Sequence, residues 1–302
     1  MRPVLSPAAR RLWRDPETLQ LGQSPERAAV LCGLDERTRA ALALLDGTRD
    51  RDQVLVAAAL AGCPPERTAL LLDLLDDAGL LEDAGTSLGP LSLLSRLERE
   101  RLAAAGVGSV DVLDDGATAP ADSGLGAADL DDVGRSRGQA ARERLRAGAP
   151  SLVPGPLPHP DLVVLAPARS ELLDDARALV PAGTPHLLAE VRDTTGIVGP
   201  LVLPGRTACL RCLDLTRTDL DPDWPALSAQ LAVPSRVRPA CDAPLAVMVA
   251  AQAAMQVLAL VDGTVDPAAA GGTLELALPD WRWRRRSWRL HPQCGCALPW
   301  TG

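Results

Sequence analysis

Two pairs of cysteines, far apart in the chain, have the spacing that most clearly indicates chemistry. Cys209 and Cys212 are separated by two residues in TACLRCLDL. Cys294 and Cys296 flank a single glycine in HPQCGCALPWTG, and Gly295 permits the tight turn that this spacing requires. Four thiolates at about 2.3 Å complete a tetrahedral zinc site without an open position, so the sequence predicts a structural zinc. A redox CxxC pair or unrelated buried thiols are the alternatives.

Three further cysteines and one histidine are candidates for a reactive, buried or sulfur-contacting role. Cys241 precedes the predicted start of a long apolar helix, whose dipole could lower a thiol pKa, so it is a candidate nucleophile. A buried inert thiol is the alternative. Cys32 and Cys63 stand at apolar positions and are predicted to lie in a core. His291, three residues before Cys294, could donate a hydrogen bond to a ligand sulfur.

The composition bounds the class of protein. A chain of 302 residues with 47% hydrophobic and 23% charged residues is globular and long enough for one large or two ordinary domains. A net charge of −8 argues against nonspecific binding of nucleic acid. The sequence has no lysine, which excludes Schiff-base and P-loop chemistry. It also lacks Asn, Phe and Tyr, whose codons are AT-rich, so we expect a GC-rich genome.

One basic segment, DWRWRRRSWRL, departs from the acidic average. Its tryptophans and arginines could stack on bases and contact phosphates of a single-stranded nucleic acid. They also fit an amphipathic late strand, with Trp281 and Trp283 on one face and Arg282 and Arg284 on the other. The acidic whole favours the strand, and nucleic acid is not an expected partner.

Location is inferred from two segments. The N-terminus MRPVLSPAARRLWRD has no apolar core of a signal peptide. The apolar stretch from Leu245 to Val261 is short for a membrane span and contains two glutamines. It predicts a buried helix with Asp242 as its N-cap and Gly263 after its end. We therefore expect a cytoplasmic protein without a membrane partner.

Residues 1–84 are predicted to form one unit. RRLWRD and ETLQLG flank Asp15-Pro16, a hairpin turn, and RAAVLCGL follows as a third strand. Three helices come next, each bounded by caps or glycines, at 35–47, 48–62 and 64–79. LLEDA is predicted to return as a short strand. Small strands with three short helices are typical of a winged-helix-like module.

Residues 85–100 are predicted to be a linker, and residues 101–302 a second domain. In that domain strands alternate with helices, which favours an α/β fold with a Rossmann-like, mostly parallel sheet. The predicted strands are 108–116, 160–167, 185–193 and 196–205, and the predicted helices are 131–150 and 169–180.

The segment GIVGPLVLPGRTACLRCLDL, followed by a distant second cysteine pair, resembles the ThiF and MoeB adenylating proteins, relatives of ubiquitin-activating enzymes. The resemblance covers about residues 101–302. Residues 1–84, notably LDGTRDRDQV, resemble a PqqD-like peptide-recognition module. In this order the two units resemble the leader-peptide-binding component of azoline-forming (TOMM) cyclodehydratases. Similar actinobacterial proteins also occur without a known peptide product.

The resemblance assigns a nucleotide site, and this chain departs from it. Asp114 matches the acid that binds ribose, and Arg137 in GRSRGQ stands where the family has its catalytic lysine. Arginine keeps the charge but not the geometry. The glycine-rich nucleotide loop is missing, because GPLSLLSRLERERLAAAG runs straight into the following helix. DSGLG and APARS replace the segments that carry the family's arginine and metal-binding acid. The resemblance therefore implies a pseudoenzyme, for which ATP and Mg²⁺ are not expected cofactors.

The implied function is that of a non-catalytic adaptor in a peptide-modifying system. A leader peptide would add as a strand beside Ala29, Val30 and Leu31, against the helix that carries Leu71 and Leu75. The adaptor would present this peptide to a separate ATP-using enzyme, and the resemblance also implies a homodimer. One alternative is an adenylyltransferase that activates a ubiquitin-like or sulfur-carrier protein. A second is a cytoplasmic regulator without a peptide substrate.

Overall fold

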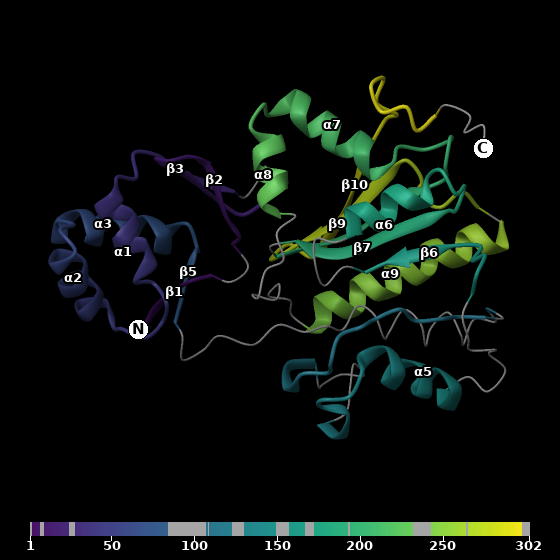
Figure 1. The fold of residues 1–302 in the computed structure, drawn as a ribbon, viewed down its shortest axis with the longest axis horizontal. Helices are drawn as coiled ribbons and strands as arrows, with labels where there is room; N and C mark the ends of the chain where they lie inside the picture. The colour runs from purple at the N-terminus through teal and green to yellow at the C-terminus, as the bar shows by residue number, and fades with distance from the viewer. Residues whose placement is uncertain are drawn as a thin grey trace. The chain divides into compact units, whose positions relative to one another are not determined.

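A computed structural model describes residues 2–6, 9–23, 28–83, 107, 109–122, 130–148, 157–166, 172–192, 194–231, 243–263 and 265–297. They belong to two compact units. Unit 1 comprises Met1–Gly89 and Ala226–Leu231, and unit 2 comprises Pro90–Pro225 and Ala232–Gly302 (Figure 1). The predicted linker at 85–100 and the segment in which the glycine loop is missing lie outside the described residues.

Unit 1 contains the three predicted helices. These are α1 (Glu36–Ala43), α2 (Arg51–Leu60) and α3 (Pro65–Asp77). The Asp35 side chain caps α1 by accepting from the Thr38 N–H, and Asp50 forms a capping box with Gln53 at the start of α2. The helix α3 begins with a proline in its first turn. The cap residues therefore fix where each helix begins.

The strands of unit 1 form two small sheets. In the first, β1 (Pro3–Leu5) pairs antiparallel with β5 (Leu81–Asp83). In the second, β2 (Arg11–Asp15), β3 (Thr18–Leu21) and β4 (Ala29–Leu31) lie in the order β2-β3-β4 with both pairings antiparallel. The predicted hairpin, third strand and returning strand are confirmed, whereas β1 was not predicted.

A core of leucines joins these elements. It draws on the inner faces of the strands and on all three helices, and its side chains are at most 9% exposed. Its buried members are Leu5, Leu19, Leu21, Leu34, Leu42, Leu45, Val54, Leu71, Leu72, Leu75, Leu80 and Leu81. Burial of a leucine side chain contributes about 1.5–3 kcal/mol, so this cluster is the main source of stability in unit 1.

Unit 2 is built on a five-stranded sheet in the order β10-β9-β8-β7-β6. The strands are β6 (Val163–Leu165), β7 (His186–Arg192), β8 (Thr195–Val202), β9 (Gly272–Ala277) and β10 (Arg282–Ser287). Only β6 and β7 run parallel, and the other three pairings are antiparallel. The prediction of a mostly parallel sheet is therefore wrong for the described strands. The links between β7 and β8 and between β9 and β10 are too short for a crossover helix, so each pair forms a hairpin.

One face of this sheet packs against the long helix α9 (Ala243–Asp262) (Figure 1). The helix contacts β7 and β8 through Leu245, Val249 and Val257. Gly196 on β8 allows this approach, because a Cβ there would lie 2.4 Å from the Val249 Cγ2. Within the described residues α9 is long and apolar enough to span a membrane, with a mean hydropathy of 1.9. Its contacts with the sheet are those of the predicted buried helix.

The opposite face carries α6 (Leu172–Leu179) and the start of α7 (Leu210–Leu220), which meet Leu165 and Leu188 of the sheet. The short helix α8 (Trp224–Leu231) follows α7. Helix α5 (Arg137–Gly148) packs on Val112 through Ala141 and Leu145.

The prediction of a strand at 108–116 is wrong, because its described residues form no strand. Acidic side chains there hydrogen-bond their own backbone instead. The Asp111 carboxylate accepts from the Val112 N–H at 2.8 Å, and the Asp114 carboxylate accepts from the Gly116 N–H at 2.8 Å. Such local bonds compete with strand pairing.

Candidate functional sites

Four cysteine sulfurs of unit 2 lie within 4.8 Å of one another. The Cys209 sulfur lies 3.9 Å from that of Cys212 and 3.4 Å from that of Cys294, and the sulfurs of Cys212 and Cys296 are 3.4 Å apart. In a tetrahedral zinc site with bonds of about 2.3 Å, the sulfurs lie about 3.8 Å apart. The four cysteines predicted from the sequence therefore converge and could hold a metal such as zinc.

Two elements position these sulfurs. Cys209 is the N-cap residue of α7, and Cys212 lies in the first turn of the helix. On the other side Gly295 has a φ of 74°, which lets the two flanking cysteines turn toward α7. The predicted donor to a sulfur is His291, but its backbone N–H donates to the Cys212 sulfur at 3.4 Å, while its ring contacts Asp219 at 2.9 Å.

The thiols influence one another strongly. The Cys209 thiol donates a hydrogen bond to the Cys212 sulfur, which lowers the pKa of Cys212 to about 4 and raises the pKa of Cys209. Burial raises the pKa of Cys296 to about 12. Because zinc binds thiolates, binding of a divalent ion would release protons from the cluster.

The other cysteines have separate environments. Cys63 is buried in unit 1 and accepts a hydrogen bond from the Thr68 hydroxyl at 3.4 Å, as expected of a core thiol. Cys32 is exposed, so its predicted place in the core is wrong. It directly follows β4, the last strand in the sheet order. The candidate nucleophile Cys241 lies outside the described residues.

The expected ribose-binding acid, Asp114, is paired with Arg137, which stands where the resemblance leads one to expect a catalytic lysine. The Arg137 Nε lies 3.2 and 3.0 Å from the two Asp114 carboxylate oxygens, and the Arg137 Nη2 lies 3.0 Å from one of them. The Arg137 Nη1 is also 3.7 Å from the buried carboxylate of Asp122, which the sequence did not indicate. Burial disfavours the charge of Arg137, but the hydrogen bond and the two carboxylates outweigh it and raise the pKa of Arg137.

The backbone around this pair leaves room only for glycine. A Cβ at Gly116 would lie 2.1 Å from the Arg137 Nη2, and a Cβ at Gly138 would lie 2.7 Å from the Asp114 carbonyl oxygen. The Arg137 N–H also donates to the Gly116 carbonyl at 2.8 Å. The loop and the start of α5 are therefore fitted to each other around the ion pair.

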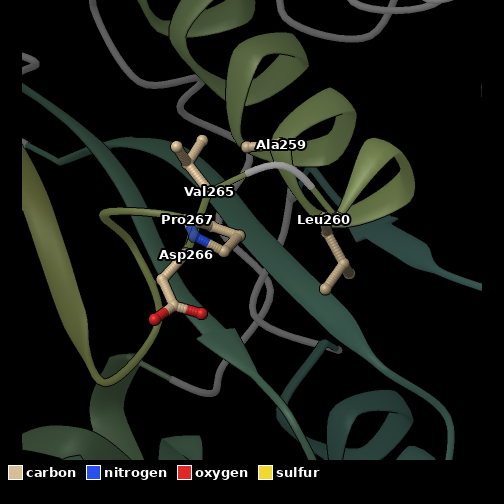
Figure 2. A pocket seen from close by; sticks show the side chains of 6 residues that line it. Ala259, Leu260, Val265, Asp266 and Pro267 are labelled. Atoms are coloured by element: carbon tan, nitrogen blue, oxygen red, sulfur yellow. The ribbon is translucent and has the colours of Figure 1, made fainter.

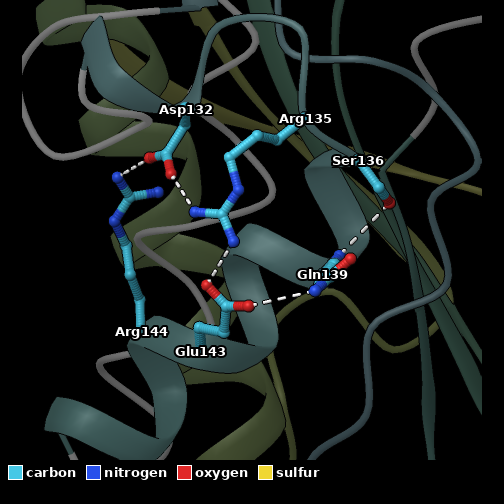
Figure 3. A network of polar contacts seen from close by, with 6 residues as sticks. All are labelled: Asp132, Arg135, Ser136, Gln139, Glu143 and Arg144. Carbon is cyan, nitrogen blue, oxygen red and sulfur yellow. Dashed lines mark hydrogen bonds and ion pairs between the residues drawn. The ribbon is translucent and has the colours of Figure 1, made fainter.

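A second set of polar contacts fixes α5 from the outside (Figure 3). Arg135 joins Asp132 at 2.9 Å to Glu143 at 2.7 Å, and Glu143 in turn accepts from Gln139 at 3.1 Å. Arg144 pairs with the same Asp132. These contacts hold the segment before Arg137 against the helix that follows it.

The residues predicted to bind a peptide divide between core and edge. Leu71 and Leu75 are 6% and 1% exposed and belong to the leucine core, against which Ala29 and Leu31 also pack. Val30 points outward and is 47% exposed. The part of this region that a partner can reach is thus Val30 and the backbone of β4, the last strand in the sheet order.

The hydrogen-bond pattern shows which backbone groups of β4 face outward. The Gly22 N–H donates to the Arg10 carbonyl, so Arg10 faces β3, and so does Leu12 two residues later. Leu12 is paired with Gln20, so the backbone groups of Gln20 face β2. Those of the neighbouring residue Leu19 therefore face β4, where Leu19 pairs with Leu31. Leu31 therefore faces β3, and the N–H and C=O of the preceding residue, Val30, point away from the sheet.

The basic segment forms β10, and its side chains are largely paired within unit 2. Arg284 lies 2.6 Å from Asp280, and Arg286 lies 3.3 Å from Glu275. Arg285 donates to the carbonyls of residues 268 and 270 at 2.8 and 3.1 Å. The segment is thus the amphipathic late strand that the sequence favoured.

An open hollow at the end of α9 is lined by Ala259, Leu260, Gly263, Val265, Asp266 and Pro267 (Figure 2). Asp266 is the one charged side chain in this lining. No convergent polar groups accompany it there, so the hollow does not have the features of a small-molecule site.

No family model and no curated protein matches the chain. Among solved structures, E. coli MccB crystallised with MccA-N7isoASN is 14% identical with a TM-score of 0.57, and the match covers 98% of this chain and 99% of that one. The microcin C7 biosynthetic enzyme MccB in complex with N-formylated MccA has a TM-score of 0.55 at 14% identity, with 98% and 100% covered. PaaA has a TM-score of 0.51 at 15% identity, with 94% and 99% covered. The chain therefore has the ThiF-like fold of MccB along nearly its whole length.

Proposed function

We propose that this protein is a peptide-binding adaptor of a peptide-modifying system and that its adenylating fold no longer catalyses. The observation that carries this proposal is the pairing of Arg137 with Asp114. The guanidinium engages both carboxylate oxygens, at 3.0 and 3.2 Å from its Nε. The acid expected to bind ribose is thus already occupied by a side chain of the same protein.

Opening this site for a nucleotide is unfavourable. Arg137 and Asp114 are only 18% and 21% exposed, and the guanidinium also faces Asp122. A ribose hydroxyl would replace a bidentate contact between two opposite charges with a hydrogen bond in which only the carboxylate is charged. The displaced arginine would need a new partner in a partly buried place. The missing glycine loop would also leave the phosphates without a row of backbone N–H donors.

The peptide would bind to unit 1 by strand addition. The N–H and C=O of Val30 point outward from an edge strand. An extended peptide can hydrogen-bond to such groups and add to the sheet as a further strand. The MccB structures that this chain resembles were solved with MccA, which supports a peptide as partner. The adaptor would present the bound peptide to a separate ATP-using enzyme, and a homodimer and a structural zinc at the four cysteines are part of the same proposal.

The test is binding of the short peptides encoded beside its gene, measured by fluorescence anisotropy on the full chain. Val30→Pro removes the outward N–H without touching the pairing with β3, and proline is tolerated on an edge strand. We expect this variant to lose binding, whereas Val30→Ala, which keeps the backbone donor, should bind within about threefold of the wild type. Equal binding by the proline variant would rule out addition at β4.

The alternative function is an adenylyltransferase. It is favoured by the similarity to E. coli MccB crystallised with ATP, at a TM-score of 0.56 and 14% identity. An assay of ATP–pyrophosphate exchange in the presence of the same peptides, or of a carrier protein ending in Gly-Gly, separates the two. Exchange that depends on Arg137 would establish the enzyme.

A further inference from the structure

A helix from the second half of the chain covers the other edge of the sheet in unit 1. The Trp13 N–H donates to the Gln230 Oε1 at 2.8 Å, and the Gln230 Nε2 donates to the Trp13 carbonyl at 2.6 Å. The Arg10 Nη2 donates to the Gln230 carbonyl at 3.3 Å. Gln230 lies near the end of α8, in the part of that helix that belongs to unit 1.

The two bonds reproduce the pairing of a β-strand. A carboxamide carries one acceptor oxygen and N–H donors, the same groups that a strand residue offers from its backbone. Along an antiparallel strand the backbone groups of successive residues face the partner strand and the outside in turn. Because the backbone groups of Arg10 and Leu12 face β3, the N–H and C=O of Trp13 face outward. Gln230 takes both of them, so a single side chain occupies the outer hydrogen-bonding position at Trp13, the middle residue of β2.

The glutamine is held in place by its own helix. The neighbouring Leu227 on α8 is 0% exposed, and the Gln230 Nε2 also lies 3.3 Å from the Ala226 carbonyl. The amide is therefore presented by a helix with a buried neighbouring residue and not by a side chain on a loop.

We infer that Gln230 determines which edge of the sheet accepts a partner. A sheet edge with free backbone groups is a template for any extended chain, and covering it with a helix prevents that pairing. With β2 occupied by Gln230, the open edge among the described strands of this sheet is that of β4 at Val30. An extended peptide then adds at β4 and in one place only. The choice of β4 as the place of peptide addition rests on the proposed function, whereas the pairing of Gln230 with Trp13 does not.

The test is amide hydrogen exchange of the full chain, followed by NMR for Trp13 and Leu12. In the wild type the Trp13 amide should be protected. In Gln230→Ala it should exchange about fivefold faster, since a hydrogen bond of about 1 kcal/mol is lost. Leu12, whose amide faces β3, should keep its rate. Gln230→Glu keeps the acceptor for the Trp13 N–H but loses the donor, so Trp13 should stay more protected than in the alanine variant.

Gln252→Ala on α9 is the matched control and should change neither rate. Equal acceleration of Trp13 and Leu12 in Gln230→Ala would mean that the helix only stabilises unit 1 as a whole. An unchanged Trp13 rate would mean that the amide does not occupy the edge. Either result would overturn the inference.

A second arm adds the peptide that binds the wild type in the anisotropy assay. In the wild type it should protect the Val30 amide and leave Trp13 unchanged, whereas in Gln230→Ala a second peptide should bind and protect Trp13. A stoichiometry of one with Trp13 still unprotected would contradict edge selection. If no peptide binds the wild type, the proposed function fails, and the exchange of Trp13 without peptide still decides whether Gln230 closes the edge.

Discussion

The outer edge of β4 and the carboxylate of Asp114 are both positions to which the family resemblance assigns a ligand, and they differ in what already contacts them. The backbone N–H and C=O of Val30 face away from the sheet, and the Val30 side chain is 47% exposed. Asp114 accepts from Arg137 through both oxygens and from the Gly116 N–H. Among the residues that the structure describes, nothing pairs with the outward groups of Val30, whereas the carboxylate of Asp114 is satisfied by the chain itself.

This difference indicates that a ligand gains more at the outer edge of β4 than at Asp114. A ligand gains little from a group that is already paired, because it must first break the internal contact. Arg137 differs from lysine in that its planar fork can hold a carboxylate at two points. Under the proposed function, one substitution at the position where the resemblance expects the catalytic lysine would convert a nucleotide site into a structural ion pair and leave the outer edge of β4 open.

The largest effect should come from the cysteine cluster, which belongs to unit 2 alone. Cys212→Ser removes one of four converging sulfurs, and structural zinc contributes on the order of 10 kcal/mol to folding in small domains. We expect bound zinc to fall from one equivalent to none, measured by atomic emission, and the Tm to drop by roughly 20 °C or more.

The matched control is Cys32→Ser, the exposed cysteine of unit 1, which should leave zinc content and Tm unchanged. A full equivalent of zinc in Cys212→Ser would show that the four sulfurs do not hold the metal. It would also remove the reason to treat unit 2 as a metal-stabilised scaffold.

The next effect concerns the ion pair itself. Arg137→Ala leaves the partly buried Asp114 and the buried Asp122 without their cation, so we expect a loss of about 2–3 kcal/mol in the free energy of unfolding. Arg137→Lys should recover part of it. Urea denaturation measures both, with Arg206→Ala, an exposed arginine, as a control expected to stay within about 0.5 kcal/mol. If Arg137→Ala behaved like the control, the pair would not close the site.

A smaller effect should follow from Gly116→Ala. The new Cβ would lie 2.1 Å from the Arg137 Nη2, so the guanidinium must move away from Asp114. The substitution removes neither of the two charged side chains. We expect about 1 kcal/mol of destabilisation by the same denaturation experiment. The added methyl group should have no further effect when Arg137 is already alanine, and an additive double mutant would contradict a shared cause.

The smallest effect is a pH dependence in unit 1. The Thr38 hydroxyl and N–H lower the pKa of Asp35, with Arg67 and Arg37 acting in the same direction. A lowered folded-state pKa contributes stability that is present above the unfolded value of about 3.9 and is lost as the pH falls through the folded value. The gap in Tm between wild type and Asp35→Ala should therefore be full at neutral pH and narrow below about pH 4. Asp52→Ala, in the first turn of α2, serves as the reference. A gap that widens on acidification would contradict the proposed role of the Asp35 cap.

The sequence was most informative where a local signal decides the structure. Asp35, Asp50 and the proline of α3 set the helix starts, and the spacing of the four cysteines identified the metal-type cluster. It failed where the partner is distant. Nothing near Asp114 indicates that Arg137 would close on it, and nothing near Gln230 indicates that its amide would pair with Trp13, because both contacts depend on packing between separate elements. The sequence predicted the direction of β8 wrongly, because the pattern of apolar residues in two successive strands does not show whether a hairpin or a crossover joins them.

The measurement that tests the central claim most directly is calorimetric titration of the full, zinc-loaded chain with ATP and Mg²⁺ in excess. The account predicts no heat of binding and no thermal shift, because Arg137 occupies the acid that a ribose would need. Clear binding in the micromolar range that is abolished by Asp114→Ala would contradict it. Asp115→Ala, the exposed neighbour, shows whether such binding depends on that one carboxylate.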